Sequence, residues 1–247
     1  MITTIILTKN SQEKIEEVIK SVLKLDGEIL VLDDESTDDT VKIAKKLGSR
    51  VEKQTGKGYA DKRNLGLKLA KEEWIFYLDS DELVTSELER EIEDVIKKGD
   101  PFVYAVPRKN IILGKAMMHG GWYPDYVERL FKKNNLEKWV GDLHERPTYK
   151  GKLGYLKNPL THLKHDNLEE MVEKTNKWSE VEAKLLFDSG HPKMSWWRFW
   201  RIMFTELMYR LVSLRGFMDG TTGIIYAIYQ MWSKFLTYAK LWEMQRK

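Results

Sequence analysis

Short apolar runs that end in polar residues recur along the first third of the chain, and they constrain its fold more than any other feature. Residues 2–7, 28–32 and 74–78 are rich in aliphatic or aromatic side chains that favour strands. Helix-like stretches lie between these runs. Strands that alternate with helices are typical of βαβ units, in which helices cover both faces of a parallel sheet. The sequence therefore predicts an α/β fold with a mainly parallel sheet.

Particular residue types indicate where the first helices begin and end. Asn10 and Glu13 have the spacing of a capping box and predict a helix that runs to about Leu25. A second helix is expected from residues 36–39 to Gly48, because glycine is common just past a helix end. The apolar run at the start of the chain has no basic leader, so we interpret it as a strand and not as a signal peptide.

The pattern changes twice in the rest of the chain. A predicted helix over residues 85–97 precedes a β-rich run over residues 102–113, and from residue 168 onward every stretch has a helical pattern. The break before the helical part predicts two domains. We expect an α/β domain over residues 1–160 and a helical extension over residues 161–247.

Acidic residues follow two of the predicted strands. Asp33 and Asp34 end one, while Asp79 and Asp81 end another. Because Asp79 and Asp81 are two residues apart, their carboxylates project to the same side of an extended segment, which is costly without a cation. Mg²⁺ and Mn²⁺ prefer oxygen ligands and often bind through one or two carboxylates plus substrate phosphates. Ligands of parallel α/β sheets bind at the carboxyl ends of strands, so the acids predict a metal and a phosphorylated substrate there. The alternative is a pair of solvated turns.

Composition excludes several classes of protein. The chain has 247 residues, 42% hydrophobic and 32% charged, which is typical of a folded protein rather than a disordered one. Cysteine is absent, so a disulfide framework and thiolate chemistry are excluded. No run approaches the roughly 20 apolar residues that span a bilayer.

The C-terminal segment is basic and rich in tryptophan. From Pro192 onward nine basic residues stand against three acidic ones, a net charge of +6, and the segment holds five of the nine tryptophans. Basic residues mixed with Trp and Tyr favour the headgroup region of an anionic membrane. Nucleic acid is the rival partner for such a patch, but the high aliphatic content favours lipid.

Apolar residues between Met194 and Leu214 surround most of the helix circumference. A helix of this kind is buried in a bundle, paired with another subunit or inserted in an interface. We expect it to pack against residues 223–238 and to leave one face for the membrane. The alternative is a homo-oligomer formed through the C-terminal helices.

Four ordered stretches resemble the inverting glycosyltransferases of family 2, which have the GT-A, Rossmann-like fold. The stretches are Thr8-Lys9-Asn10 and residues 31–40, 62–67 and 74–82. Glu35 stands where the family usually has glycine. A closer resemblance, to lipopolysaccharide core enzymes that add glucose to an inner-core heptose, rests on residues 121–125, 129–131, 144–145 and 216–220.

The resemblance implies a role for each acidic or basic residue of the motifs. The residues implied to bind the nucleotide-sugar donor are Thr8, Asn10, Asp33, Asp34, Lys62, Arg63 and Asp79. Asp81 and Asp79 are implied to hold Mg²⁺ or Mn²⁺, with Asp81 the more direct ligand. The alternatives are helix-terminal acids for Asp33 and Asp34 and surface charges for Lys62 and Arg63.

An inverting transfer also needs a base that takes the proton of the acceptor hydroxyl. Asp125 is the leading candidate by its spacing before residues 129–130, although Pro124 stands where the family usually has Glu. The other candidates are Glu145 and Asp142, and His144 is expected to contact the metal or the leaving phosphate. The residues expected on the acceptor side are Trp122, Tyr123, Asp142 and Arg129, with core packing the alternative for the two aromatic residues.

The resemblance therefore implies a metal-dependent enzyme that moves a sugar from a UDP-sugar, such as UDP-glucose, to a lipid-linked saccharide. We expect it in the cytoplasm, peripheral on the inner face of the cell membrane. A sugar-phosphate nucleotidyltransferase is the nearest chemical alternative, but Thr8-Lys9-Asn10 is not its glycine-rich phosphate loop. An inactive sugar-nucleotide-binding scaffold is the alternative from another class.

Overall fold

The computed structural model describes residues 1–54, 58–99, 103–141 and 145–247. The chain forms two compact units. The first contains Met1–Arg108 and Asp125–His162, and the second contains Lys109–Pro124 and Leu163–Lys247. We call them the α/β unit and the helical unit.

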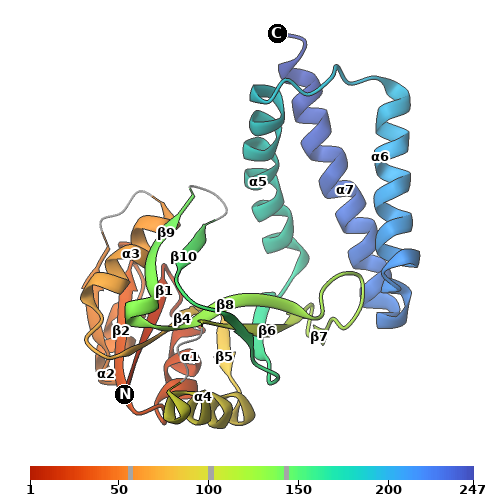
Figure 1. Ribbon diagram of the computed structural model, residues 1–247. Coiled ribbons are helices and arrows are strands. Elements are labelled where there is room, and N and C mark those ends of the chain that lie inside the picture. Colours follow the sequence, from red (N-terminus) through yellow and green to blue (C-terminus); the bar gives the residue numbers. More distant parts are fainter. Residues whose placement is uncertain (55–57, 100–102, 142–144) are drawn as a thin grey trace. The chain divides into compact units, whose positions relative to one another are not determined.

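The α/β unit is built around one large sheet (Figure 1). The strands of the α/β unit are β1 (Ile2–Thr8), β2 (Gly27–Asp33), β3 (Arg50–Lys53), β4 (Trp74–Asp79), β5 (Glu82–Val84), β6 (Val103–Ile112), β8 (Asp125–Lys132), β9 (Leu136–Val140), β10 (Arg146–Tyr149), β11 (Leu153–Tyr155) and β12 (Leu160–His165). Its helices are α1 (Ile15–Val22), α2 (Thr40–Lys46), α3 (Tyr59–Leu69), α4 (Ser86–Lys98) and the short η1 (Lys133–Asn135). The last residues of β6 and β12 belong to the helical unit.

The sheet has the strand order β3-β2-β1-β4-β8-β6-β12-β5. The pairs within β3-β2-β1-β4 are parallel, as the strand–helix alternation predicts. Beyond β4 the pairs of β8 with β4 and β6 and of β12 with β5 are antiparallel. The α/β prediction is confirmed, and the sheet is mixed because β6 and β8 follow each other along the chain without a crossover helix between them.

Each face of the sheet carries its own apolar core. On one face Ile6 and Phe76 pack with residues of α1, α2 and α4. On the other face Ile5 and Tyr77 pack with α3 and with Trp139 of the β9–β10 hairpin. Successive residues of β1 and β4 thus alternate between two buried faces, which explains why these strands are apolar throughout.

The predicted starts of the first two helices are wrong. Helix α1 begins at Ile15, and its N-cap residue makes no side-chain cap, so Asn10 and Glu13 form no capping box. Asn10 instead has φ +47° and its side-chain oxygen accepts from the Thr37 backbone N–H at 2.9 Å. Helix α2 begins at Thr40 and not at Ser36, since the loop before it is held to Asn10.

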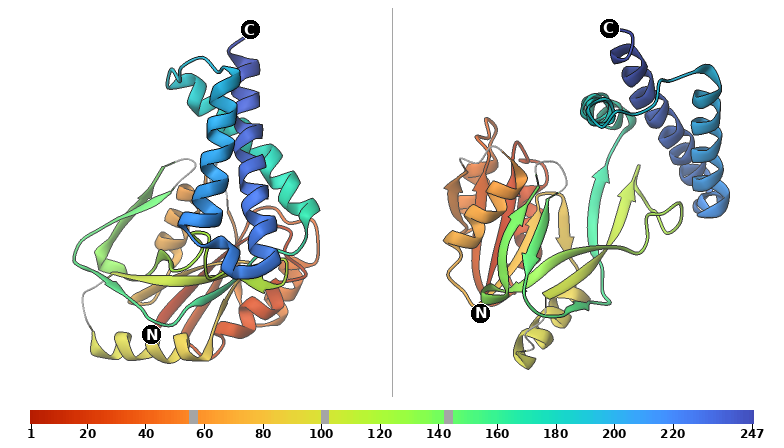
Figure 2. Two further views of the ribbon diagram at one scale, coloured as in Figure 1. Left: turned by 90° about the vertical axis from the view of Figure 1, so that its right-hand side faces the viewer. Right: turned by 45° about the horizontal axis from the view of Figure 1, so that its top comes forward.

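The helical unit contains α5 (Leu168–Asp188), α6 (Trp196–Met208), η2 (Tyr209–Ser213), η3 (Gly216–Asp219) and α7 (Gly220–Met244), with the short strand β7 (Lys115–Ala116). Helices α5 and α6 both pack along α7 (Figure 2). Phe199 of α6 lies 5.8 Å from Phe235 of α7, ring centroid to ring centroid. The predicted packing of residues 194–214 against residues 223–238 is confirmed. Within the described part of the chain, no helix is long and apolar enough to cross a membrane.

Candidate active site

The carboxyl ends of three parallel strands meet at one edge of the α/β unit. The register of β1 places Thr8 opposite Asp33 of β2 and Leu7 opposite Asp79 of β4. The acids of the two predicted strand ends therefore flank β1 on either side. The expectation that both acidic ends share one edge of the sheet is confirmed.

Asp33 is buried at this edge with part of its hydrogen-bonding capacity unused. Its Oδ2 accepts from the Ser36 backbone N–H at 3.0 Å, which shapes the turn after β2. Its Oδ1 and the Thr8 hydroxyl are buried without a hydrogen-bond partner in the described structure. Buried polar atoms nearly always have partners, so these two oxygens indicate a place where a ligand supplies hydrogen bonds.

Asp34 points to the side of the site that α3 borders. It accepts from Lys62 Nζ at 2.8 Å and from Lys9 Nζ at 3.3 Å. The hydrogen bond from Lys62 lowers the pKa of the Asp34 carboxyl against the opposing effect of burial. Two cations and one carboxylate leave this part of the edge positive, which suits a phosphate group.

Arg63 lies at the centre of the edge with only 5% of its side chain exposed. Its Nη2 donates to Asp79 Oδ1 at 3.1 Å, and its Nε donates to Glu145 Oε1 at 3.2 Å. The guanidinium lies over the Trp139 ring at 4.9 Å. The third nitrogen, Nη1, is buried and has no hydrogen-bond partner in the described structure. Arg63 is therefore held rigidly with one donor available for an anionic ligand.

Asp79 joins Arg63 to a network of ion pairs around Arg129 and the fully buried Glu82. Arg129 of β8 donates to Asp79 Oδ2 and, at 2.7 Å, to Glu82 Oε1, and Glu82 is fully buried. The second oxygen of Glu82 accepts from the Asp79 backbone N–H at 3.0 Å. Burial would raise the pKa of Asp79, but the charges of Arg129 and Arg63 outweigh burial and hold that pKa below its usual range. Both Asp79 oxygens thus contact arginines in this structure.

Asp81 lies beside His162 of β12. The distance from Asp81 Oδ2 to His162 Nε2 is 3.6 Å, and 9% of the His162 side chain is exposed. The described residues contain no group of three or more His, Cys, Asp or Glu side chains that could hold a metal ion. A carboxylate and an imidazole nitrogen nevertheless fit a cation whose remaining ligands are water and substrate phosphates.

Asp125, the leading candidate for the base, is the first residue of β8. Its Oδ2 accepts from Arg108 Nε at 2.9 Å and lies 2.7 Å from Arg108 Nη2, and 27% of its side chain is exposed. Glu145, the other described candidate, contacts Arg63. Asp142 and His144 lie outside the described residues.

Two of the residues expected on the acceptor side belong to the helical unit. The Trp122 ring packs edge-on against Tyr226 of α7 at 5.1 Å, and its carbonyl accepts from the Asn110 side-chain amide. Trp122 thus packs against other side chains of the helical unit, as the core-packing alternative expects. Tyr123 is half-buried, and Arg129 lies in the buried network. Their contact with an acceptor stays a prediction.

Sequence reasoning missed Glu82, Arg108 and His162. Glu82 was inconspicuous because it directly follows the Asp-x-Asp motif, and Arg108 and His162 lie on antiparallel strands whose register the sequence does not give. One signal was available for His162. It lies two residues after Leu160 in a short β-like run and so shares a strand face with it, at a position where an apolar residue is common.

The fold and the residues at the carboxyl ends of β1, β2 and β4 define an α/β protein with a candidate ligand site at the ends of parallel strands. The cations and acids of this site suit a phosphorylated ligand. The model of glycosyl transferase family 2 matches residues 3–151, and the chain belongs to this family.

Relatives along the whole chain carry names of the same class. An uncharacterised glycosyltransferase of Rickettsia prowazekii is 28% identical over 261 residues, which cover 100% of this chain and 88% of that protein. The lipopolysaccharide core biosynthesis glycosyltransferase LpsC of Rhizobium meliloti is 24% identical over 98% of this chain and 92% of its own length. Among solved structures, S. aureus TarS in complex with UDP-GlcNAc aligns with a TM-score of 0.49 at 16% identity, over 98% of this chain and 88% of that one.

Proposed function

We propose that this glycosyltransferase is a metal-dependent, inverting enzyme that takes a sugar from a nucleotide donor. The observation that carries the proposal is that Asp33 Oδ1 and Arg63 Nη1, two buried polar atoms without partners among the described residues, lie at the same strand edge as the Asp81–His162 pair. An acceptor for a base N–H, a donor for a phosphate oxygen and two metal ligands are what a nucleotide-sugar diphosphate requires.

The donor is held by the residues around β1. Asp33 accepts from the nucleobase N–H, with Thr8 and Asn10 beside it. Arg63 Nη1 donates to a diphosphate oxygen, and Lys62 and Asp34 border the phosphates. These contacts fit a UDP-sugar, such as UDP-glucose.

Asp81 and His162 are the residues that would hold Mg²⁺ or Mn²⁺. When bound, such a cation neutralises the negative charge that builds up on the departing nucleoside diphosphate. Asp79 orients Arg63 and Arg129 through its two oxygens, so we assign it to positioning these cations beside the donor rather than to direct ligation.

Asp125 takes the proton from the acceptor hydroxyl as that oxygen attacks the anomeric carbon from the face opposite the diphosphate. Arg108 fixes Asp125 Oδ2 with two N–H groups, which orients the carboxylate. Glu145 is the second candidate for this role. Its contact with Arg63 makes it equally suited to orienting that arginine.

The acceptor we propose is a lipid-linked saccharide such as the lipopolysaccharide inner core. The name of the relative LpsC supports this class of acceptor. In the helical unit Trp196, Trp200 and Phe204 of α6 are largely exposed on one side of the helix, with Arg201 beside them. Such a surface suits the headgroups of an anionic membrane, so we place the enzyme in the cytoplasm at the inner face of the cell membrane.

A donor-hydrolysis screen tests the enzyme. UDP-, GDP- and dTDP-sugars are incubated with the full chain, with and without Mn²⁺. We expect metal-dependent turnover of a UDP-sugar, and failure to bind or turn over any donor contradicts the proposal.

The base is tested by matched isosteric substitutions. Asp125→Asn should lower transfer by about 10²–10⁴-fold and leave donor binding close to that of the wild type. If Glu145→Gln behaves in this way and Asp125→Asn does not, Glu145 is the base.

A further inference from the structure

Ion pairs connect the donor-binding edge of the α/β unit to the proposed base. Arginines and carboxylates alternate along this connection, and each lies within 3.5 Å of the next. In order, the members of this ion-pair chain are Glu145, Arg63, Asp79, Arg129, Glu82, Arg108 and Asp125. Arg63 is the donor-side arginine and Asp125 is the base, so the residues between them link these two groups physically.

Glu82 lies in the middle part of the ion-pair chain and is fully buried. Its Oε1 accepts from Arg129 at 2.7 Å and lies 3.5 Å from Arg108 Nη1. Its Oε2 accepts from the Asp79 backbone N–H at 3.0 Å, which closes the loop that carries Asp81. Because Glu82 has no exposed surface, it cannot touch a donor or an acceptor. Any role of this carboxylate in the reaction acts through its neighbours.

Arg108 uses all three nitrogens of its guanidinium between Glu82 and Asp125. Its Nε and Nη2 lie 2.9 Å and 2.7 Å from Asp125 Oδ2, and its Nη1 faces Glu82. A guanidinium is planar and its donors have fixed directions, so a contact that fixes Nη1 also fixes the other two nitrogens. The buried Glu82 thus determines where Arg108 presents its N–H groups to the partly exposed Asp125.

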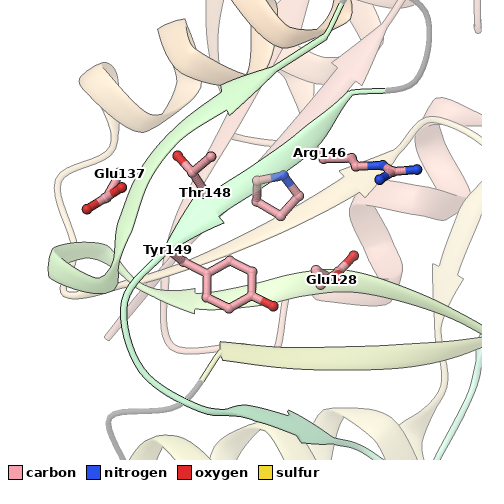
Figure 3. Close-up of a pocket in the computed structure, with 6 residues that line it drawn as sticks. Glu128, Glu137, Arg146, Thr148 and Tyr149 are labelled. Carbon is pink, nitrogen blue, oxygen red and sulfur yellow. The ribbon is translucent and has the colours of Figure 1, made fainter.

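Another carboxylate of β8, that of Glu128, lies outside the ion-pair chain. Side chains alternate between the two faces of a strand, so Glu128 projects from the face opposite to that of Asp125. With Tyr149 it lines a cavity to which β8, β9 and β10 contribute residues (Figure 3). Glu128 therefore faces away from Arg108, and it offers a matched comparison on the same strand as the base.

We propose that Glu82 is a positioning residue for the base. It fixes Arg108, and Arg108 holds Asp125 in the direction from which that carboxylate takes the proton of the acceptor hydroxyl. The proton passes from the acceptor oxygen to Asp125, and Glu82 neither gains nor loses one. A displacement of about 1 Å at a reacting group can lower a rate by about 10²-fold, so this support matters for the transfer. The inference rests on the proposed role of Asp125 as the base.

A double-mutant cycle of Glu82→Gln with Asp125→Asn tests this role in the full chain. The measured rate is the release of UDP from saturating UDP-glucose with Mn²⁺, with water as the acceptor whose proton Asp125 takes. Glutamine keeps the size of Glu82 but turns one accepting oxygen into a donor, so it cannot face both the arginines and the Asp79 N–H as Glu82 does. We expect Glu82→Gln to lower kcat at least about tenfold.

The second half of the cycle distinguishes positioning from a merely structural effect. In Asp125→Asn the base is already absent, so Glu82→Gln should lower kcat by no more than about twofold further. The control Glu128→Gln should keep the kcat of the wild type. If Glu82→Gln lowers kcat as strongly in Asp125→Asn as in the wild type, or leaves the wild-type kcat unchanged, the positioning role is refuted.

Arg108→Lys tests the same link without altering the buried carboxylate, so it serves if Glu82→Gln does not fold. Lysine keeps a positive charge beside Asp125 but has one nitrogen in place of three, so it cannot hold both carboxylates as the guanidinium does. We expect Arg108→Lys to lose as much kcat as Arg108→Met. Wild-type kcat in Arg108→Lys would show that only the charge beside Asp125 matters, and it would refute the role of Glu82.

The same measurements separate a failure of this inference from a failure of the proposed function. If Asp125→Asn lowers kcat and the effect of Glu82→Gln simply multiplies with it, only the positioning role is wrong. If Asp125→Asn keeps the kcat of the wild type, the base assignment is wrong and the inference falls with it. If the wild type neither binds nor turns over UDP-glucose, the proposed donor is wrong as well.

Discussion

The α/β unit and the helical unit are both rich in charged and aromatic side chains, but they place them in opposite environments. In the α/β unit Arg129 and Glu82 are buried and paired around Asp79. In the helical unit Trp196 and Trp200 of α6 are 77% and 67% exposed. Buried charges fix the geometry of a site, whereas exposed tryptophans add little to stability and suit an external partner. Substitutions in the two regions should therefore change different properties.

The largest expected effect is on folding of the α/β unit. Arg129→Met removes the cation between Glu82 and Asp79 and leaves the fully buried Glu82 carboxylate without its shortest ion pair. We expect the free energy of unfolding to fall by about 3–5 kcal/mol. Urea denaturation followed by circular dichroism measures this change.

Trp200→Ala is the matched substitution in the helical unit. Because its side chain is mostly exposed, we expect its free energy of unfolding to stay within about 0.5 kcal/mol of the wild type. Equal losses in the two variants would show that the contrast between the units is wrong.

The next effect concerns the metal. His162→Asn removes an imidazole 3.6 Å from Asp81 that we propose as a metal ligand. We expect at least about tenfold weaker activation by Mn²⁺, since even changes at residues that only contact metal ligands weaken metal binding by about 10–100-fold. The Mn²⁺ dependence of donor hydrolysis measures the effect. His165→Asn, on the same strand, is the control, and an identical change in both variants would exclude a specific role for His162.

A smaller effect is expected at the membrane. Trp200→Ala should weaken binding to phosphatidylglycerol vesicles about tenfold, since loss of ~1.4 kcal/mol of apolar burial changes an equilibrium constant by that factor. Trp178→Ala, at a half-exposed tryptophan of α5, should bind as the wild type does. Recovery of all wild-type protein in the supernatant at low salt would rule out membrane attachment.

The smallest effect is on acid stability. Lys62 lowers the pKa of Asp34 in the folded protein, so the Asp34–Lys62 pair stabilises the fold above the unfolded pKa of about 4 and loses that contribution as the pH falls through the folded pKa. The free energy of unfolding of Asp34→Asn should therefore fall less on acidification than that of the wild type. The difference should be less than about 1 kcal/mol because the pair is partly exposed. Thermal unfolding of the wild type and of Asp34→Asn between about pH 3 and pH 7 measures this difference. Parallel curves of melting temperature against pH would contradict the stabilising role of the Asp34–Lys62 pair.

The parallel half of the sheet was predictable from the sequence. Strands β1, β2 and β4 are apolar because both of their faces are buried, and their acidic ends fall at one edge by topology alone. Local pattern failed at Asn10, whose side chain binds the loop after β2 instead of capping α1. A capping box and a loop tether require the same residue type, and only the tertiary structure distinguishes them.

The partners of the acids could not be predicted. His162 is 81 residues from Asp81, and the β12–β5 pairing that brings them together is antiparallel and three residues long. Arg108 reaches Asp125 because β6 and β8 pair in one particular register. Such registers depend on bulges and turns that hydrophobic patterns do not specify.

Calorimetric titration with UDP, in the presence and absence of Mn²⁺, tests the central claim most directly. We predict that Mn²⁺ strengthens UDP binding to the wild type at least tenfold and has little effect on Asp81→Asn. Equal affinity of the wild type for UDP with and without Mn²⁺, or equal strengthening in Asp81→Asn, would contradict a metal-assisted donor site at this strand edge.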